Sequence, residues 1–194
     1  MNFLKRKRDT ELHYNKLSDK KDIILVAKDI GKNGAKTFTT TSNKTVYETI
    51  LSNNKNSVES NFYEFWLQDQ EIKFSLDIDL ENTCKNPNTI VHKNCRNVIN
   101  ELKKFKSNYS YKNVIILKSK PTDLKLNSFH VIFTGVKFKS HKHAKNFFNH
   151  LKKTYEMKGC DDSIYNSTVL RCCYCTKFGR DNYSVNINDR YQIK

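Results

Sequence analysis

The feature that most constrains this chain is segment 72–80, in which apolar and polar residues alternate at every position. The alternation continues to residue 81 and separates an apolar set from a polar set: Phe74, Leu76, Ile78 and Leu80 against Ser75, Asp77, Asp79 and Glu81. Successive side chains of a strand point to opposite faces, so the segment predicts a strand with one buried face and one polar face. The fold must therefore include a sheet that covers a core on one side and carries two aspartates on the other.

Other segments predict that strands and helices are interleaved along the chain. Strands are expected where β-branched and aromatic residues cluster, and helices where apolar residues recur at helical spacing. The expected strands span 23–27, 36–41, 61–67, 114–117, 129–133, 163–165, 170–175 and 183–187. The expected helices span 44–51, 91–105 and 141–153. This order predicts the α+β or α/β class, with one mixed sheet covered by helices. Residues 1–20 are polar and lack periodicity, which predicts a flexible basic arm ahead of one folded domain over 21–194.

The chain is strongly basic, with 35 Lys and Arg against 20 Asp and Glu among 194 residues, a formal net charge of +15. Such a charge attracts polyanions, and lysines scattered over the whole chain favour nucleic acid over a membrane surface. No apolar run approaches the ~20 residues of a membrane span, and the basic cluster at 5–8 lacks the apolar stretch of a secretory signal. We therefore expect an intracellular protein without a membrane partner, whose six cysteines are reduced thiols or metal ligands.

Three polar clusters are candidates for chemistry. Asp77 and Asp79 share one face of a strand, about 6–7 Å apart at their Cα atoms, where carboxylates can converge on hard divalent cations. Ser128 and His130 share one face of another strand and can hydrogen-bond phosphate groups. The third cluster combines late acidic residues with cations that can pair with phosphate: Asp161, Asp162, Arg171, Lys177 and Arg180. Each cluster taken alone also fits a solvated strand face, a strand edge or a basic loop.

Taken together and in this order, the clusters resemble the motifs of the archaeo-eukaryotic primase superfamily. The flanking segments resemble its PrimPol branch, which includes the primases of large DNA viruses: Lys36-Thr37-Phe38, Tyr47, Phe62-Tyr63-Glu64 and the strand that ends at Asp79. The resemblance covers residues 23 to 190. It implies a primase-type catalytic module in which an α/β N-terminal part merges with an RRM-like mixed sheet.

The resemblance also implies an activity and a role for each site residue. The activity is template-dependent nucleotidyl transfer, that of a DNA primase or primase-polymerase making or extending primers on single-stranded DNA from nucleoside triphosphates. Two Mg²⁺ or Mn²⁺ ions would be held by Asp77, Asp79 and Asp161, with Asp161 favoured over Asp162 by its spacing to 164–165. The residues that would contact the incoming nucleotide are Ser128, His130, Arg171 and Lys177. A replicative helicase is a further candidate partner. The expected location is the nucleus or a viral replication site.

Two alternatives to a polymerising enzyme stay open. The same scaffold suits a catalytically weak or inactive nucleic-acid-binding domain of a replication complex, and the Asp pair also suits a metal-dependent nuclease. Zinc is not expected: Cys84, His92 and Cys95 follow the first motif, but no fourth ligand with suitable spacing follows them. The cysteines at 160, 172, 173 and 175 are expected to be small buried thiols.

Overall fold

The computed structural model describes residues 1–20, 22–31, 35–56, 58–67, 69–119, 127–167, 169–176 and 184–186. The chain divides into two compact units, Met1–Leu67 with Thr168–Ser184, and Gln68–Ser167 with Val185–Lys194. The described residues form five α-helices and two sheets, so the class is α+β. None of these helices is long and apolar enough to cross a membrane.

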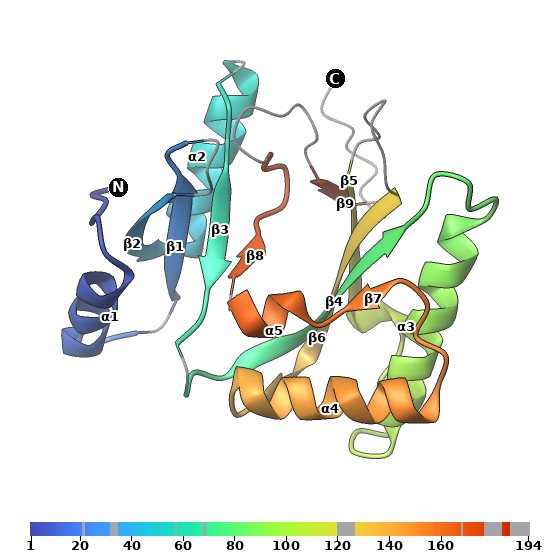
Figure 1. Cartoon of the computed structure of the whole chain (residues 1–194). Coiled ribbons are helices and arrows are strands. Elements are labelled where there is room, and N and C mark those ends of the chain that lie inside the picture. Colours follow the sequence, from blue (N-terminus) through green and yellow to red (C-terminus); the bar gives the residue numbers. More distant parts are fainter. Residues whose placement is uncertain are drawn as a thin grey trace. The chain divides into compact units, whose positions relative to one another are not determined.

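The first unit contains a four-stranded sheet in the order β2-β1-β3-β8, with every neighbouring pair antiparallel (Figure 1). Its elements are α1 (Lys7–Lys16), β1 (Ile23–Asp29), β2 (Lys36–Ser42), α2 (Asn43–Lys55), β3 (Phe62–Phe65) and β8 (Val169–Arg171). Ala27 in β1 pairs with Phe38 of β2 and with Tyr63 of β3. Leu25, Ala27, Tyr63 and Phe65 form a buried cluster in this sheet.

The N-terminal residues differ from the expected flexible arm. Residues 7–16 form helix α1, which contacts β2 and buries Thr10 completely. Ahead of the helix, Leu4 and Phe38 exchange two backbone hydrogen bonds, of 2.6 and 2.8 Å. The helix has no broad apolar stripe that periodicity could reveal, because charged and polar residues together fill most of its positions.

The second unit follows a β-α-β-β-α-β order. Its elements are β4 (Ile72–Leu80), α3 (Pro87–Lys103), the 3₁₀ turn η1 (Tyr111–Asn113), β5 (Val114–Ser119), β6 (Asn127–Phe138), α4 (His141–Thr154), β7 (Cys160–Asp161), α5 (Ser163–Ser167) and β9 (Ser184–Asn186). The sheet order is β7-β4-β6-β5-β9, so β4 and β6 are central and the helical crossovers skip one strand (Figure 1).

The expectation of a single mixed sheet is wrong. There are two sheets, and the pairings of β4 with β6, β4 with β7 and β5 with β6 are all antiparallel. Short links join β1 to β2 and β5 to β6. A short link suits an antiparallel hairpin, because two parallel neighbouring strands need a crossover connection of a dozen or more residues. Helices α3 and α4 do make such crossovers, but an antiparallel strand lies between the two strands that each of them connects.

Most predicted elements are confirmed with shifted ends, and one is wrong. Segment 72–80 is a strand over its whole length, and the helices expected at 91–105 and 141–153 are α3 and α4. The strand expected at 163–165 is instead helix α5. The Asp161 carboxylate accepts a hydrogen bond from the Ser163 backbone amide at 2.8 Å, and this local cap starts a helical turn. The strand expected at 170–175 ends at Arg171, and Tyr174 has a left-handed φ of 61°.

One face of β4 and β6 packs against the helices. Phe74 is fully buried, and its ring centroid lies 5.0 Å from that of Phe147 in α4 and 5.6 Å from that of Phe133 in β6. The rings of Phe138 and Tyr165 also lie within 6.1 Å of it. The predicted apolar face of segment 72–80 is therefore the centre of this unit's core, which leaves the opposite face for polar side chains.

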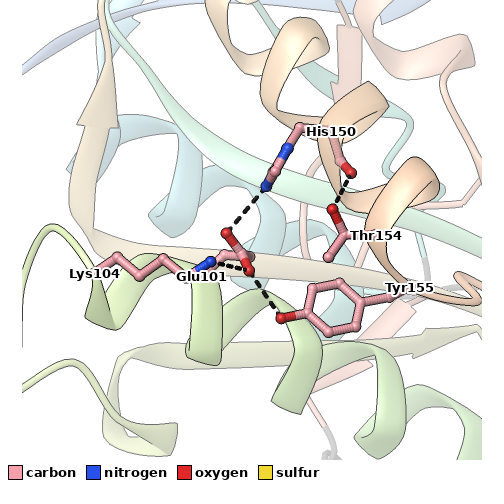
Figure 2. Close-up of polar contacts among 5 residues, drawn as sticks. All are labelled: Glu101, Lys104, His150, Thr154 and Tyr155. Atoms are coloured by element: carbon pink, nitrogen blue, oxygen red, sulfur yellow. Dashed lines mark hydrogen bonds and ion pairs between the residues drawn. The ribbon is translucent and has the colours of Figure 1, made fainter.

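A buried carboxylate joins α3 to the end of α4 (Figure 2). Glu101 accepts hydrogen bonds from Lys104 Nζ at 2.7 Å, Tyr155 Oη at 2.8 Å and His150 Nε2 at 3.1 Å. The hydrogen bond from Lys104 is the largest of the effects that lower the pKa of Glu101 to about 2 from its ordinary 4.5, and burial partly opposes them. The ionised carboxylate is thus stabilised by three donors from two helices.

This carboxylate predicts a specific acid sensitivity. Because the folded-state pKa of Glu101 lies below its unfolded value, its stabilisation is complete above pH 4.5 and is lost as the pH falls towards 2. We expect Glu101→Gln to lower the free energy of unfolding at pH 7 and to flatten its decline between pH 5 and 2. Urea unfolding followed by circular dichroism at several pH values measures both effects. An unchanged pH slope would show that Glu101 does not carry this dependence.

Candidate metal and nucleotide site

Four strands of the second unit contribute to one row of residues across the sheet. In β4, Asp77 pairs with Asp161 of β7 on one side and with His130 of β6 on the other. His130 in turn pairs with Leu117 of β5. Directly opposed side chains on neighbouring antiparallel strands have Cβ atoms about 4.5–5.5 Å apart. The structure therefore places Asp161, predicted from a distant part of the sequence, beside Asp77.

The next row adds the remaining two predicted residues of this unit. Asp79 in β4 pairs with Ser128 in β6. Asp79 shares the face of Asp77, because the two residues are two positions apart in one strand, and the same holds for Ser128 and His130. The face opposite the helices therefore carries five of the predicted site residues: Asp77, Asp79, Ser128, His130 and Asp161.

The acidic and basic members of this face differ in exposure. Asp79 and Asp161 are exposed, Asp77 is half-buried, and His130 is buried. His130 Nε2 lies 3.4 Å from Asp77 Oδ1, so the imidazole directly contacts the carboxylate from the neighbouring strand. The carboxylates are accessible to a ligand, while the imidazole is held in the sheet surface.

Asp161 and Asp162 have different neighbours. Asp161 lies in the β7–β4 register, and its Oδ1 accepts from the Ser163 amide. Asp162 instead lies 3.1 Å from Lys145 Nζ of α4. The geometry thus associates Asp161 with the sheet face and Asp162 with the helix layer.

Gly159 was not identified from the sequence, yet it sets how closely β7 approaches β4. Its φ is +73°, and a Cβ atom built there would lie 2.5 Å from Leu80 Cδ2 and 2.8 Å from the Asp79 carbonyl oxygen. The Asp79 amide donates to the Gly159 carbonyl at 3.0 Å. Only glycine suits this approach, and the one available signal was a glycine two positions before Asp161 in a glycine-poor chain.

The donor chemistry of this face suits a hard divalent cation, because Asp77, Asp79 and Asp161 offer carboxylate oxygens from adjacent positions. Among the described residues, however, no three His, Cys, Asp or Glu side chains converge closely enough to form a metal-binding group. Like-charged carboxylates repel each other, and Asp161 Oδ1 is directed to the Ser163 amide. Binding would therefore require side-chain rotations, while the backbone register already brings the three residues together.

The two remaining predicted residues, Arg171 and Lys177, do not belong to the described part of this sheet. Arg171 belongs to the first unit, where it is buried in β8 and pairs with Tyr63 of β3. In that sheet the Tyr63 hydroxyl donates to Asp29 Oδ2 at 2.7 Å, and Lys36 forms an ion pair with the same carboxylate. Burial, ahead of the hydrogen bond to Asp29, raises the pKa of Tyr63. Lys177 and Arg180 lie outside the described residues.

The cysteine and histidine residues after β4 do not assemble with one another. His92 Nδ1 contacts the Tyr111 hydroxyl at 2.8 Å. Cys95 is fully buried, and burial raises the pKa of its thiol to about 11. Cys84 is half-buried in the loop that precedes α3. These residues therefore belong to separate environments.

In comparisons with known proteins, no protein-family model matches this chain, and no curated protein matches it significantly.

Proposed function

We propose that this protein is a metal-dependent nucleotidyltransferase, a DNA primase or primase-polymerase of the archaeo-eukaryotic primase type. The observation that carries the proposal is the register of Asp161 with Asp77 across β7 and β4, beside Asp79. The β-α-β-β-α-β order of the second unit agrees with an RRM-like sheet carrying the site. The net charge of +15 supports a polyanionic template.

The proposed chemistry divides the sheet face by charge. Asp77, Asp79 and Asp161 would hold two Mg²⁺ or Mn²⁺ ions through their carboxylate oxygens. Such ions, when bound, activate an attacking hydroxyl and stabilise the charge on the leaving oxygen. Ser128 lies beside Asp79 and can donate a hydrogen bond to a phosphate oxygen of the incoming nucleotide. His130 contacts Asp77, so a nucleotide bound at the carboxylates would lie beside the imidazole.

The test is nucleotide incorporation on a primer-free, single-stranded oligonucleotide with Mn²⁺, nucleoside triphosphates and the full chain. Labelled products longer than a single nucleotide support the proposal. DNA binding without incorporation would instead identify a binding domain of a replication complex, and shortening of labelled DNA without added nucleotides would identify a nuclease. The site of action would be the nucleus or a viral replication site, with a replicative helicase as partner.

The proposed nucleotide contacts predict a defect in substrate binding. A hydrogen bond to a charged group contributes about 1.5–3 kcal/mol, so its loss corresponds to roughly 10- to 100-fold in affinity. We expect Ser128→Ala to raise the KM for nucleotide by this range and to change kcat less. Steady-state incorporation at varied nucleotide concentration measures both constants.

Thr134→Val is the matched control. Thr134 lies on the same strand and face, but its hydroxyl donates to the Asn113 carbonyl at 3.0 Å, away from the carboxylates. Its KM should stay near that of the unmodified chain. Equal KM values for Ser128→Ala and Thr134→Val would exclude a phosphate contact by Ser128.

A further inference from the structure

The two long helices of the second unit carry the same pattern of polar side chains. The pattern is a cation, a second cation three residues later, an asparagine seven residues later, and two cations ten and eleven residues later. In α3 and the residue after it, the pattern is Lys93, Arg96, Asn100, Lys103 and Lys104. In α4 it is Lys142, Lys145, Asn149, Lys152 and Lys153. All ten side chains are exposed except Lys145, which is half-buried.

The fold relates these two helices by an approximate two-fold axis. β4 leads into α3 and β6 leads into α4, and β4 and β6 pair antiparallel at the centre of the sheet. The direct contact between the helices agrees with this relation. Glu101 and His150 occupy the same position in the repeated pattern, and they meet at 3.1 Å (Figure 2). The repeated cations therefore form two equivalent arms on either side of one contact.

Ordinary helix electrostatics explain only part of these arms. Cations in the last turn of a helix are stabilised by the helix dipole, which accounts for Lys103, Lys152 and Lys153. The same dipole disfavours Lys142, which lies in the first turn of α4, where no acidic residue is present. Arg96, Lys103, Lys142 and Lys153 form no ion pair with another described residue. A polyanion would compensate the charge of these four cations, whereas Lys93, Lys104 and Lys145 already form ion pairs with acidic side chains.

We infer that the outer faces of α3 and α4 form a binding surface for the phosphate backbone of double-stranded nucleic acid. The two strands of a duplex are related by two-fold axes, as the β4–α3 and β6–α4 segments are by the antiparallel pairing of β4 with β6. From Lys142 to Lys153 an arm is ~16 Å long, and over that length of its axis a duplex carries about ten phosphates on its two strands together. The asparagines can donate hydrogen bonds to the same phosphate oxygens. This surface lies on the opposite face of the sheet from the carboxylates, so it goes beyond the proposed function.

The test is the salt dependence of binding to a 20-base-pair duplex, measured by fluorescence anisotropy without nucleotides or divalent ions. The variants are Arg96→Gln with Lys103→Gln on one arm, Lys142→Gln with Lys153→Gln on the other, and all four together. Each phosphate contact contributes about 0.9 to the slope of log K against log salt concentration. We expect the fourfold variant to reduce that slope by about 3 to 4, and each pair of substitutions by about half as much.

A control variant with the same change of net charge separates this surface from general attraction. Lys16, Lys20, Lys44 and Lys55 are exposed in the first unit, and their joint replacement by Gln should reduce the slope by less than 1. Matching circular dichroism spectra and Tm values establish that all variants are folded. The inference fails if the fourfold variant and the control reduce the slope of log K against log salt concentration by the same amount. It also fails if the fourfold variant weakens binding to a single strand of equal length as much as binding to the duplex. It also fails if the substitutions abolish binding to anionic phospholipid vesicles and leave duplex binding unchanged.

This result is independent of the polymerising activity. A changed salt slope in a chain that incorporates no nucleotide would support the duplex surface and reject the proposed function. If the fourfold variant incorporates nucleotide and its salt slope is unchanged, the proposed function is supported and the duplex surface is rejected.

Discussion

Asp77→Asn is expected to abolish nucleotide incorporation while leaving duplex binding intact. Asp77 is central among the carboxylates, since it pairs with Asp161 and lies two residues from Asp79 in the same strand. The amide keeps the shape of the side chain but removes the negative charge that a divalent cation requires. Loss of a residue that hydrogen-bonds to a metal ligand typically lowers metal affinity or activity 10- to 100-fold. We therefore expect removal of a direct ligand to lower the incorporation rate by more than roughly 100-fold. Incorporation at saturating Mn²⁺ and nucleotide measures the effect.

The adjacent acidic residues provide a matched comparison. Asp161→Asn should reproduce the loss, because Asp161 lies in register with Asp77. Asp162→Asn should retain most activity, because Asp162 pairs with Lys145 of α4. If Asp162→Asn is the inactive variant and Asp161→Asn is active, the assignment of the third ligand is wrong. If all three variants incorporate nucleotide normally, the carboxylates take no part in catalysis.

Phe74→Ala is expected to cause the largest loss of stability among single substitutions in the second unit. Phe74 is fully buried on the apolar face of the strand that carries Asp77, and aromatic rings from β6, α4 and α5 surround it. Truncating a buried phenylalanine costs about 3–5 kcal/mol, through lost transfer energy and the cavity that remains. Urea unfolding followed by far-ultraviolet circular dichroism measures this change.

Phe105→Ala is the control for this prediction. Phe105 is 80% exposed, and a surface substitution of this kind changes stability by no more than about 0.5 kcal/mol. Phe74→Leu retains most of the apolar volume, should lose less stability than Phe74→Ala, and remains measurable if the alanine variant does not fold. Similar losses for Phe74→Ala and Phe105→Ala would show that Phe74 does not pack as the structure indicates.

These two predictions concern opposite faces of one strand, and the sequence alone predicted both faces. Alternation is a local property: in an extended chain, side chains two residues apart share a face whatever the strand pairs with. Asp77 and Asp79 therefore share a strand face because they are two residues apart. Ser128 and His130 share a face for the same reason. The two amphipathic helices α3 and α4 were predicted for a similar reason, because helical periodicity is also local.

Other features depended on long-range contacts. The single mixed sheet was wrong because strand direction depends on which strands become neighbours. The helix at 163–167 is different, because its cap, the Asp161 side chain, is a local contact that the pattern of β-forming residues does not reveal. Helix α1 was missed because its position depends on contacts with β2 rather than on an apolar stripe.

The sequence by itself determined which side chains share a strand face or a helix face, since those relations are set within a few residues by backbone geometry. Only the tertiary structure decided that β7 pairs with β4 through the close approach at Gly159, which places Asp161 beside Asp77. It also decided that Glu101 and His150 meet, which reveals the equivalence of the two cationic helices. Such partners are distant in the chain, so their contact depends on how the whole sheet and its core pack.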